Sequence, residues 1–96
     1  MKNILSMKYF SWNEEKNEQL KKERKISFEE IVVQIENDKV LDIVEHPNKE
    51  KYPNQIIIIV ECNKYAYLVP FVESDDKIFL KTIIPSRNAT KEYLDK

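Results

Sequence analysis

The sequence of 96 residues contains no glycine. Phosphate-binding P-loops, dinucleotide-binding fingerprints and the clamp loop of KH domains need backbone without a Cβ atom, so these three kinds of site are excluded. Tight turns must use asparagine and aspartate instead, because these residues tolerate positive φ better than other side chains do. The candidate turns are Asn37-Asp38, Asn48, Asn63 and Asp75-Asp76.

Cysteine, histidine and long apolar runs are also scarce. Cys62 is the single cysteine, so we expect no internal disulfide and a reducing, cytoplasmic environment. No apolar run approaches the roughly 18 residues of a membrane span, and residues 1–7 are too short an apolar stretch for a secretory signal, so we expect no membrane partner. Cys62 and the single histidine, His46, have no companions at metal-ligand spacing. We therefore expect no metal and no cofactor.

Charge is distributed unevenly, although the net charge is only −1. Residues 1–25 carry +3 (seven basic, four acidic), residues 26–76 carry −7 (four basic, eleven acidic) and residues 77–96 carry +3 (five basic, two acidic). Two interpretations are open. One is a mixed, solvated surface. The other is that the two basic ends converge on one face that binds phosphate groups.

The hydrophobic pattern predicts a single α+β domain over residues 1–96. A short aromatic strand at 8–12 precedes a polar helix over about 14–24, capped by Asn13, and Ser27 opens a second helix with a capping box. We expect these two N-terminal helices to pack on a sheet of three or four antiparallel strands, followed by a short C-terminal helix. The expected strands are 40–44, 55–62, 65–72 and 78–84, with a hairpin turn at Asn63-Lys64 and a last helix that follows Pro85 and ends near Leu94.

Three stretches carry a resemblance to a known family. They are Phe10-Ser11-Trp12-Asn13-Glu14-Glu15-Lys16-Asn17, Ile26-Ser27-Phe28-Glu29-Glu30 and Lys81-Thr82-Ile83-Ile84-Pro85-Ser86-Arg87-Asn88-Ala89-Thr90. In this order they resemble BrnT-type toxins of bacterial type II toxin–antitoxin pairs, whose fold is akin to RelE. There are departures from the family pattern: Asn13 stands at an aspartate position, Glu23-Arg24-Lys25 stands where the family often has Lys-His-Gly, and the closing helix holds fewer arginines.

The resemblance implies a ribonuclease toxin that needs no metal, halts translation and is silenced by a cognate antitoxin. RNA and the antitoxin are the implied partners, and a hetero-oligomer with the antitoxin is implied as well. In such cleavage the 2′-hydroxyl attacks the adjacent phosphate, so the protein must stabilise negative charge and move protons. Arg87 is the first catalytic candidate, because a guanidinium matches phosphate oxygens and keeps its charge. We expect free amides of the last helix to add to its anion site.

Three further residues are catalytic candidates. Lys16 matches the lysine of the family's first helix, Tyr93 is a proton donor for the leaving oxygen, and His46 is the one side chain that titrates near neutrality without help. We expect the lysines of the opening helix and Arg87 to lie side by side over the sheet. Each candidate also has a structural interpretation: a paired surface arginine, a solvated lysine, a tyrosine packed on the sheet and a turn histidine. The candidate RNA-binding residues are Arg24, Lys81 and Lys91.

Two other functions stay open. A toxin-fold module that binds its antitoxin without cleaving RNA is favoured by the arginine at position 24, which replaces the charge of the family's histidine but not its proton transfer. A gyrase-directed toxin of the ParE kind is the third hypothesis. The aromatic residues Tyr65, Tyr67 and Phe71 share a parity on one expected strand, so they are either stacking platforms for bases or part of the core, and we favour the core.

Overall fold

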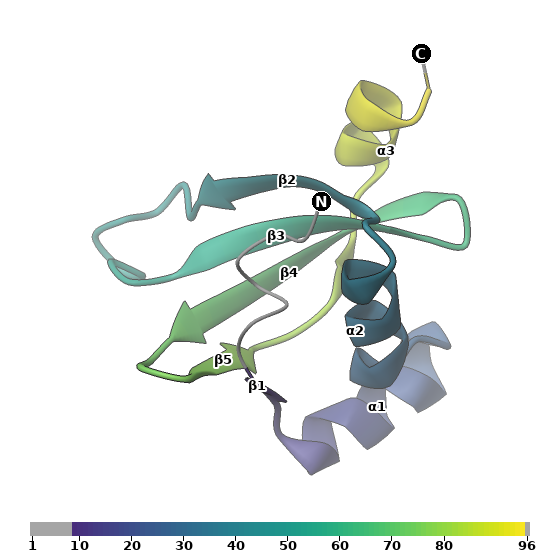
Figure 1. The fold of residues 1–96 in the computed structure, drawn as a ribbon. Helices are drawn as coiled ribbons and strands as arrows, with labels where there is room; N and C mark the ends of the chain where they lie inside the picture. Colours follow the sequence, from purple (N-terminus) through teal and green to yellow (C-terminus); the bar gives the residue numbers. More distant parts are fainter. Residues whose placement is uncertain (1–8, 96) are drawn as a thin grey trace.

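The fold is taken from a computed structural model that describes residues 9–95 (Figure 1). It confirms the α+β class, with helices and a mostly antiparallel sheet in one chain. In chain order the elements are β1 (Tyr9–Ser11), α1 (Glu14–Arg24), α2 (Phe28–Glu36), β2 (Val40–Glu45), β3 (Ile56–Cys62), β4 (Tyr65–Glu73), β5 (Lys77–Leu80), β6 (Ile84–Pro85) and α3 (Arg87–Tyr93).

The sheet has six strands in the order β1-β5-β4-β3-β2, with β6 pairing with β4 outside this path. The expectation of three or four antiparallel strands is therefore wrong in two respects. The opening strand joins the sheet parallel to β5, with Tyr9 beside Lys77. The stretch predicted as one strand over 78–84 is divided into β5 and β6, so the predicted order of elements fails at this point.

The division between β5 and β6 has a local cause. Leu80 pairs with Phe71 and Ile84 pairs with Leu68, so four steps along this side match three steps along β4. One extra residue therefore bends the chain out of register, as in a β-bulge. Within the bend Ile83 is fully buried in the core, and Pro85, expected to end the strand, is the last residue of β6.

Both N-terminal helices begin as their caps predict. Asn13 Oδ1 accepts a hydrogen bond from the Lys16 amide at 2.9 Å, and Ser27 with Glu30 forms the complete capping box. These contacts satisfy amides that have no partner within the helix. Because the chain lacks glycine, other residues take positive φ, and within residues 9–95 they are Lys25, Asp38, Asn63 and Lys64. The predicted hairpin turn at Asn63-Lys64 is confirmed, while Lys25 ends α1 in a conformation that glycine usually adopts.

The face of the sheet under α1 and α2, called the helix face here, carries the larger core. Leu20 of α1 and Phe28, Ile31 and Ile35 of α2 pack against Ile58 and its neighbours on the same face of the sheet. Phe28 is fully buried, stacked on Trp12 with ring centroids 5.6 Å apart. The predicted apolar stripe of the second helix is confirmed as core, although Val32 is only partly buried.

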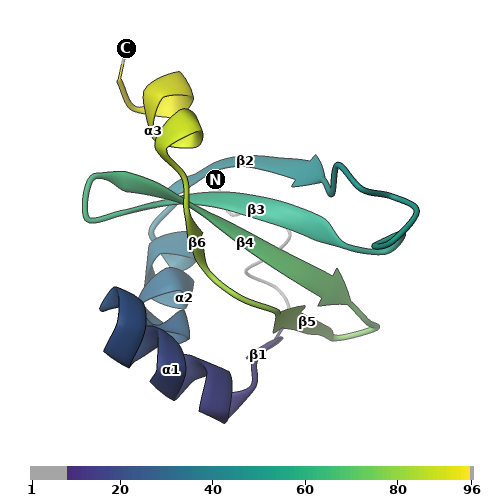
Figure 2. The same ribbon diagram turned by 180° about the vertical axis from the view of Figure 1, so that it is seen from behind.

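The opposite face, called the α3 face, has a smaller core beneath one short helix (Figure 2). Ala89 of α3 packs with Ile57, Ile59 and Ala66, and Tyr93 and Leu94 lie at its margin. Figures 1 and 2 both place α1 and α2 below the sheet and α3 above it. No helix of residues 9–95 combines the length and hydropathy that a membrane crossing requires.

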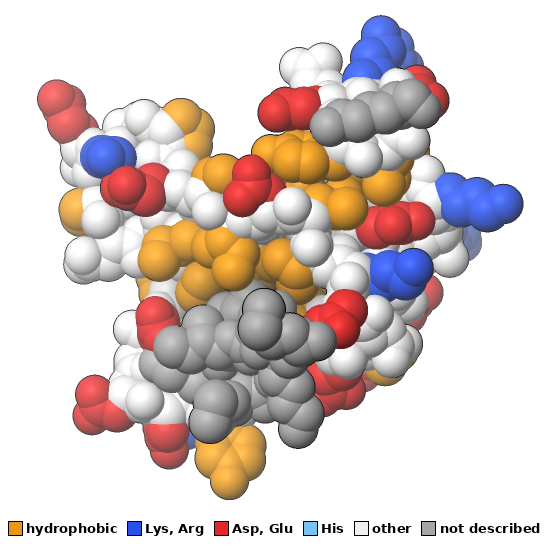
Figure 3. All heavy atoms as spheres, turned by 45° about the horizontal axis from the view of Figure 1, so that its top comes forward, with side chains coloured by type: hydrophobic (Ala, Val, Ile, Leu, Met, Phe, Trp, Pro, Cys, Tyr) orange, Lys and Arg blue, Asp and Glu red, His pale blue; other side chains and the backbone are white. Residues whose placement is uncertain are grey.

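Two large apolar side chains of β2, those of Ile43 and Val44, remain at the surface. Ile43 is 41% exposed and Val44 is 36% exposed, and they point to opposite faces of the sheet because Ile43 lies beside Ile58 and Val44 beside Ile57. Figure 3 views the molecule from above β2 and shows hydrophobic side chains on both sides of this strand, with acidic side chains among them. The end of the sheet formed by β2 is therefore less covered than the centre.

Candidate functional site

The site predicted around Arg87 depends on how the sheet holds α3. Ser86 caps the helix with its hydroxyl, which accepts from the Ala89 amide at 3.1 Å, and its own amide donates to the Ala66 carbonyl at 3.0 Å. The Thr90 hydroxyl accepts from the Ala66 amide at 2.9 Å and donates to the Ser86 carbonyl at 2.7 Å. These bonds fix the start of α3 to Ala66, near the beginning of β4. Arg87 therefore lies where the last strand meets the last helix, as predicted.

Arg87 is exposed at the first position of α3. Its side chain makes no hydrogen bond or ion pair with residues 9–95, so it is not the paired surface arginine that we considered. Lys91 follows four residues later and is exposed as well, so the two cations are neighbours on one side of the helix. The anion site expected from the helix amides is small, because α3 has only seven residues and Ser86 already caps one amide.

Tyr93 connects α3 to β2. Its hydroxyl donates to Asp42 Oδ2 at 2.6 Å. This bond raises the pKa of Tyr93 to about 12, and it also holds the pKa of Asp42 below its ordinary value, with help from the Ile43 amide. The catalytic role of Tyr93 stays a prediction, but its proton is already committed to a carboxylate that attracts it.

The basic groups of α1 do not gather around Arg87 as expected. Lys16 lies in the first turn of α1, which packs on the helix face, whereas Arg87 opens α3 on the other face. The expectation that the opening-helix lysines and Arg87 lie side by side is therefore wrong. Arg24, at the other end of α1, donates from its guanidinium to the Ile83 carbonyl, four residues before Arg87. Only this end of the opening helix reaches the segment that leads to α3.

His46 lies in the loop between β2 and β3, at the end of the sheet remote from α3 (Figure 1). Its Nδ1 accepts from the Asn48 amide at 3.1 Å, and its ring is 4.4 Å from that of Tyr52. These contacts are those of a turn residue, which was the structural interpretation. The fold does not bring His46 to the other catalytic candidates.

Lys81 lies in the bend between β5 and β6. Its amide donates to the Pro70 carbonyl at 2.8 Å, and its ammonium lies 5.6 Å from the ring centroid of Phe79. The side chain is exposed, so it is available to a phosphate. Neither of these contacts joins Lys81 to α3, and its RNA-binding role stays a prediction.

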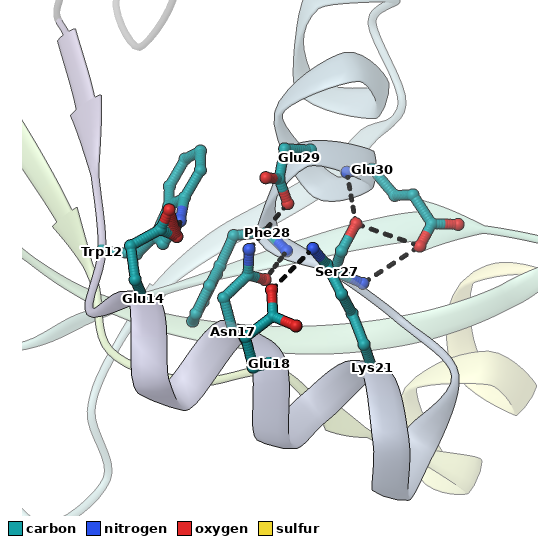
Figure 4. A network of polar contacts seen from close by, with 9 residues as sticks. All are labelled: Trp12, Glu14, Asn17, Glu18, Lys21, Ser27, Phe28, Glu29 and Glu30. Atoms are coloured by element: carbon teal, nitrogen blue, oxygen red, sulfur yellow. Dashed lines mark hydrogen bonds and ion pairs between the residues drawn. The ribbon is translucent and has the colours of Figure 1, made fainter.

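Asn17, in the first stretch that resembles the toxin family, has a structural role (Figure 4). Its side chain is fully buried, donates to Glu29 Oε1 at 2.8 Å and accepts from the Phe28 amide at 2.8 Å. The bond from Asn17 is the main reason that the pKa of Glu29 is lowered. Because both ends of the amide are satisfied, Asn17 fixes α1 to the start of α2.

The remaining candidates are accounted for by packing. Burial raises the pKa of the Cys62 thiol, which makes it a poor nucleophile and fits the structural role expected for it. Phe71 is 2% exposed and Tyr67 is half-buried beside the helix-face core, so the core interpretation holds for both. Tyr65 is half-buried with its ring 5.7 Å from that of Tyr67. Within residues 9–95 no three acidic, histidine or cysteine side chains form a group able to hold a metal ion.

Asp42 is the residue that the sequence analysis missed. It interrupts the apolar run of β2 where the register shifts between Val40 and Asp42, and it accepts hydrogen bonds from both the Tyr93 hydroxyl and the Ile43 amide. The sequence feature that could have identified Asp42 is a single carboxylate inside an otherwise apolar stretch, Val40-Leu41-Asp42-Ile43-Val44.

Comparisons of the chain with protein-family models, with curated proteins and with solved structures found no match.

Proposed function

We propose that this chain is the toxin-fold member of a bacterial type II toxin–antitoxin pair, acting in the cytoplasm, and that it binds its antitoxin without cutting RNA. The three stretches that resemble BrnT-type toxins support the pairing with an antitoxin. The observation that carries the second half is the separation of the expected catalytic groups: Lys16 belongs to the helix face, Arg87 to the α3 face and His46 to a remote loop.

Cleavage through the 2′-hydroxyl needs a base, an acid and a cation within reach of one phosphate. Around Arg87 the described residues supply two cations, Arg87 and Lys91, and the hydroxyls of Ser86, Thr90 and Tyr93, each of which already makes a hydrogen bond. Asp42 is held ionised by that bond and is no acid at neutral pH. This set of groups suits binding better than proton transfer.

Co-expression tests the proposal. The chain, carrying an affinity tag, is produced together with the protein encoded by the neighbouring reading frame, and the complex is isolated and its stoichiometry measured by light scattering. We expect a stable complex that withstands gel filtration. A neighbour that elutes separately at micromolar concentration, where binary toxin–antitoxin complexes persist, contradicts the proposal.

The ribonuclease is the second candidate, and one observation favours it. The Arg24 guanidinium reaches the Ile83 carbonyl, so one basic group of the opening helix does approach the segment that carries Arg87. If the chain cleaves RNA, its induction alone arrests bacterial growth and Arg87→Ala relieves the arrest. Lys22→Ala is the matched control, because Lys22 is an exposed cation of α1 on the other face of the sheet. Equal arrest by both variants removes Arg87 from the mechanism.

A further inference from the structure

Within the part of the chain that the structure describes, the β2 strand forms an edge of the sheet. Among residues 9–95 its one neighbour is β3, and it presents six residues, whereas β1 at the other edge has only three. Proteins normally blunt such edges with lysine, proline or short strand length, because the open backbone groups otherwise pair with another chain. Val40–Glu45 contains neither lysine nor proline. Its one irregularity lies near its start, between Val40 and Asp42.

The side chains of this edge also suit a covered strand. Ile43 on the helix face and Val44 on the α3 face are adjacent and both exposed, so each face of the sheet ends on an apolar group at β2. A strand laid along β2 would cover both. β-Branched side chains opposite them would make the cross-strand contacts that stabilise such a pair.

The acidic residues of β2 determine which kind of strand can pair with it. Asp42 lies beside Ile59 on the α3 face and Glu45 lies beside Ile56 on the helix face, and β2 holds no basic residue. A second copy of β2 would bring four carboxylates to one seam with no cation from either strand. Glu45 does bind Lys49 at 2.9 Å, but both side chains are largely exposed, and such pairs contribute little.

We propose that β2 accepts an extended segment of a partner protein as an additional strand, and that this segment carries two basic residues separated by two β-branched ones. The spacing follows from the register: Asp42 and Glu45 are three residues apart and face opposite sides, so their basic partners on a paired strand are also three apart. This inference rests on the proposed function, because it names the surface through which the partner is bound.

One backbone group of the edge is already occupied. The Ile43 amide donates to Asp42 Oδ1 at 2.8 Å, so an incoming carbonyl must share or replace this bond. When the Ile43 amide leaves Asp42 and donates to the incoming carbonyl, a basic side chain opposite Asp42 compensates for the lost bond, because it forms an ion pair with the released carboxylate. The same bond protects the edge against strands that lack a cation at this position.

Two synthetic peptides of equal composition test the spacing. The first is acetyl-Thr-Thr-Lys-Val-Val-Lys-Thr-Thr-amide, and the second, with Lys-Val-Lys-Val at its centre, places both lysines on one face. NMR titration of the ¹⁵N-labelled full chain follows the amides of Val40–Glu45. We expect the first peptide to bind about threefold or more tightly than the second, because it forms two cross-strand ion pairs and the second forms one. Equal binding overturns the proposal.

Ile43→Lys and Val33→Lys form a matched pair of variants. Their parent residues are similarly exposed, at 41% and 49%, but Val33 lies on α2, where it lines a pocket with Cys62 and Asn63 at the end of β3, and is not part of the edge strand. We expect Ile43→Lys to weaken binding of the first peptide about tenfold, as lysine on an edge strand does, and Val33→Lys to leave it unchanged. Equal effects overturn the proposal, as does a wild-type dimer that Ile43→Lys dissociates, since the occupant is then a second copy.

The failure of this inference differs from that of the proposed function. A neighbouring-frame protein that binds Ile43→Lys as tightly as Val33→Lys leaves the function standing and removes β2 as the surface. Preferential binding of the first peptide at β2, without any complex with the neighbour, leaves the edge as an interaction site and removes the toxin–antitoxin pairing.

Discussion

The two faces of the sheet are built differently. On the helix face, two helices bury Phe28, Ile31 and Ile58 completely and are joined by the buried amide of Asn17. On the α3 face, one helix of seven residues covers only part of the sheet, and Ile57 and Ile59 keep 7% and 6% of their surface exposed. The difference indicates that the helix face supplies most of the stability. The α3 face and the adjoining β2 edge are less fully covered by residues 9–95.

Adjacent isoleucines of β3 test this comparison most strongly. Ile58 points to the helix face and Ile59 to the α3 face. Truncation of a buried isoleucine to alanine costs about 2–5 kcal/mol, more where neighbours cannot relax into the cavity. We expect Ile58→Ala near the upper end of that range and Ile59→Ala near the lower end, measured by urea denaturation. An equal loss of unfolding free energy would mean that the two faces contribute alike.

Substitution of Asn17 is expected to cause the next largest loss of unfolding free energy. Asn17→Ala leaves the Phe28 amide and one Glu29 oxygen without their partner, so we expect a loss of about 1–3 kcal/mol. Asn17→Asp keeps the acceptor for Phe28 but places a second carboxylate beside Glu29.

The pH dependence of the stability of Asn17→Asp distinguishes the loss of the hydrogen bond to Glu29 from the repulsion between the two carboxylates. The pKa of Glu29 is lowered in the folded wild type, so the stability from its bond with Asn17 is present above the ordinary value of 4.5 and lost as pH falls through the folded value. In Asn17→Asp the repulsion is present at pH 7 and is relieved when one carboxyl is protonated. The variant should therefore approach the wild type between pH 7 and pH 4 in urea titrations. A constant difference would contradict this account.

A smaller effect is expected at the contact between α3 and β2. Tyr93→Phe removes the hydrogen bond to Asp42 while keeping the ring, so amides of α3 should exchange several-fold faster and those of α2 should not change. The pKa of Asp42 should also rise toward its ordinary 3.8. Because the folded pKa is lowered in the wild type, this stabilisation is present above pH 3.8 and lost at lower pH. Unchanged exchange in α3 would show that Ala89 and Thr90 hold the helix without Tyr93.

The smallest effect on stability is expected at Arg87. Its side chain is exposed and has no partner among residues 9–95, so Arg87→Ala should change the unfolding free energy by less than about 0.5 kcal/mol. Thermal denaturation checks this value. A larger loss would mean that Arg87 holds α3 in place, and functional tests with this variant would then need a stability control.

Local signals in the sequence predicted most of the elements. The Asn13 cap and the Ser27 capping box fixed where α1 and α2 begin, and Asn63-Lys64 formed the expected hairpin turn. The bend before β6 was not predicted, because it depends on Ile83 turning into a core built by distant residues. The polar pair Lys81-Thr82 lies at the bend, but polar residues also occur on the exposed face of a continuous strand, so this pair alone did not predict the shift in register.

The candidate site was harder to predict than the fold. Charge and family resemblance made Arg87 the first catalytic candidate, but neither contains the information that α1 and α3 pack on opposite faces. The bond between Tyr93 and Asp42 joins residues 51 positions apart, so only the folded sheet reveals it. Spacing along the chain predicts neighbours within a helix or strand, whereas a site assembled from several elements requires their packing.

The integrity of RNA tests the central claim most directly. The purified full chain is incubated with total bacterial RNA and with translating ribosomes in the presence of a metal chelator, and RNA ends are analysed. The account predicts intact RNA, because the candidate proton donor Tyr93 is engaged by Asp42 and the candidate base His46 lies in a remote loop. Cleavage that leaves 2′,3′-cyclic phosphate ends and disappears in Arg87→Ala would contradict it, and would make the chain a metal-independent ribonuclease.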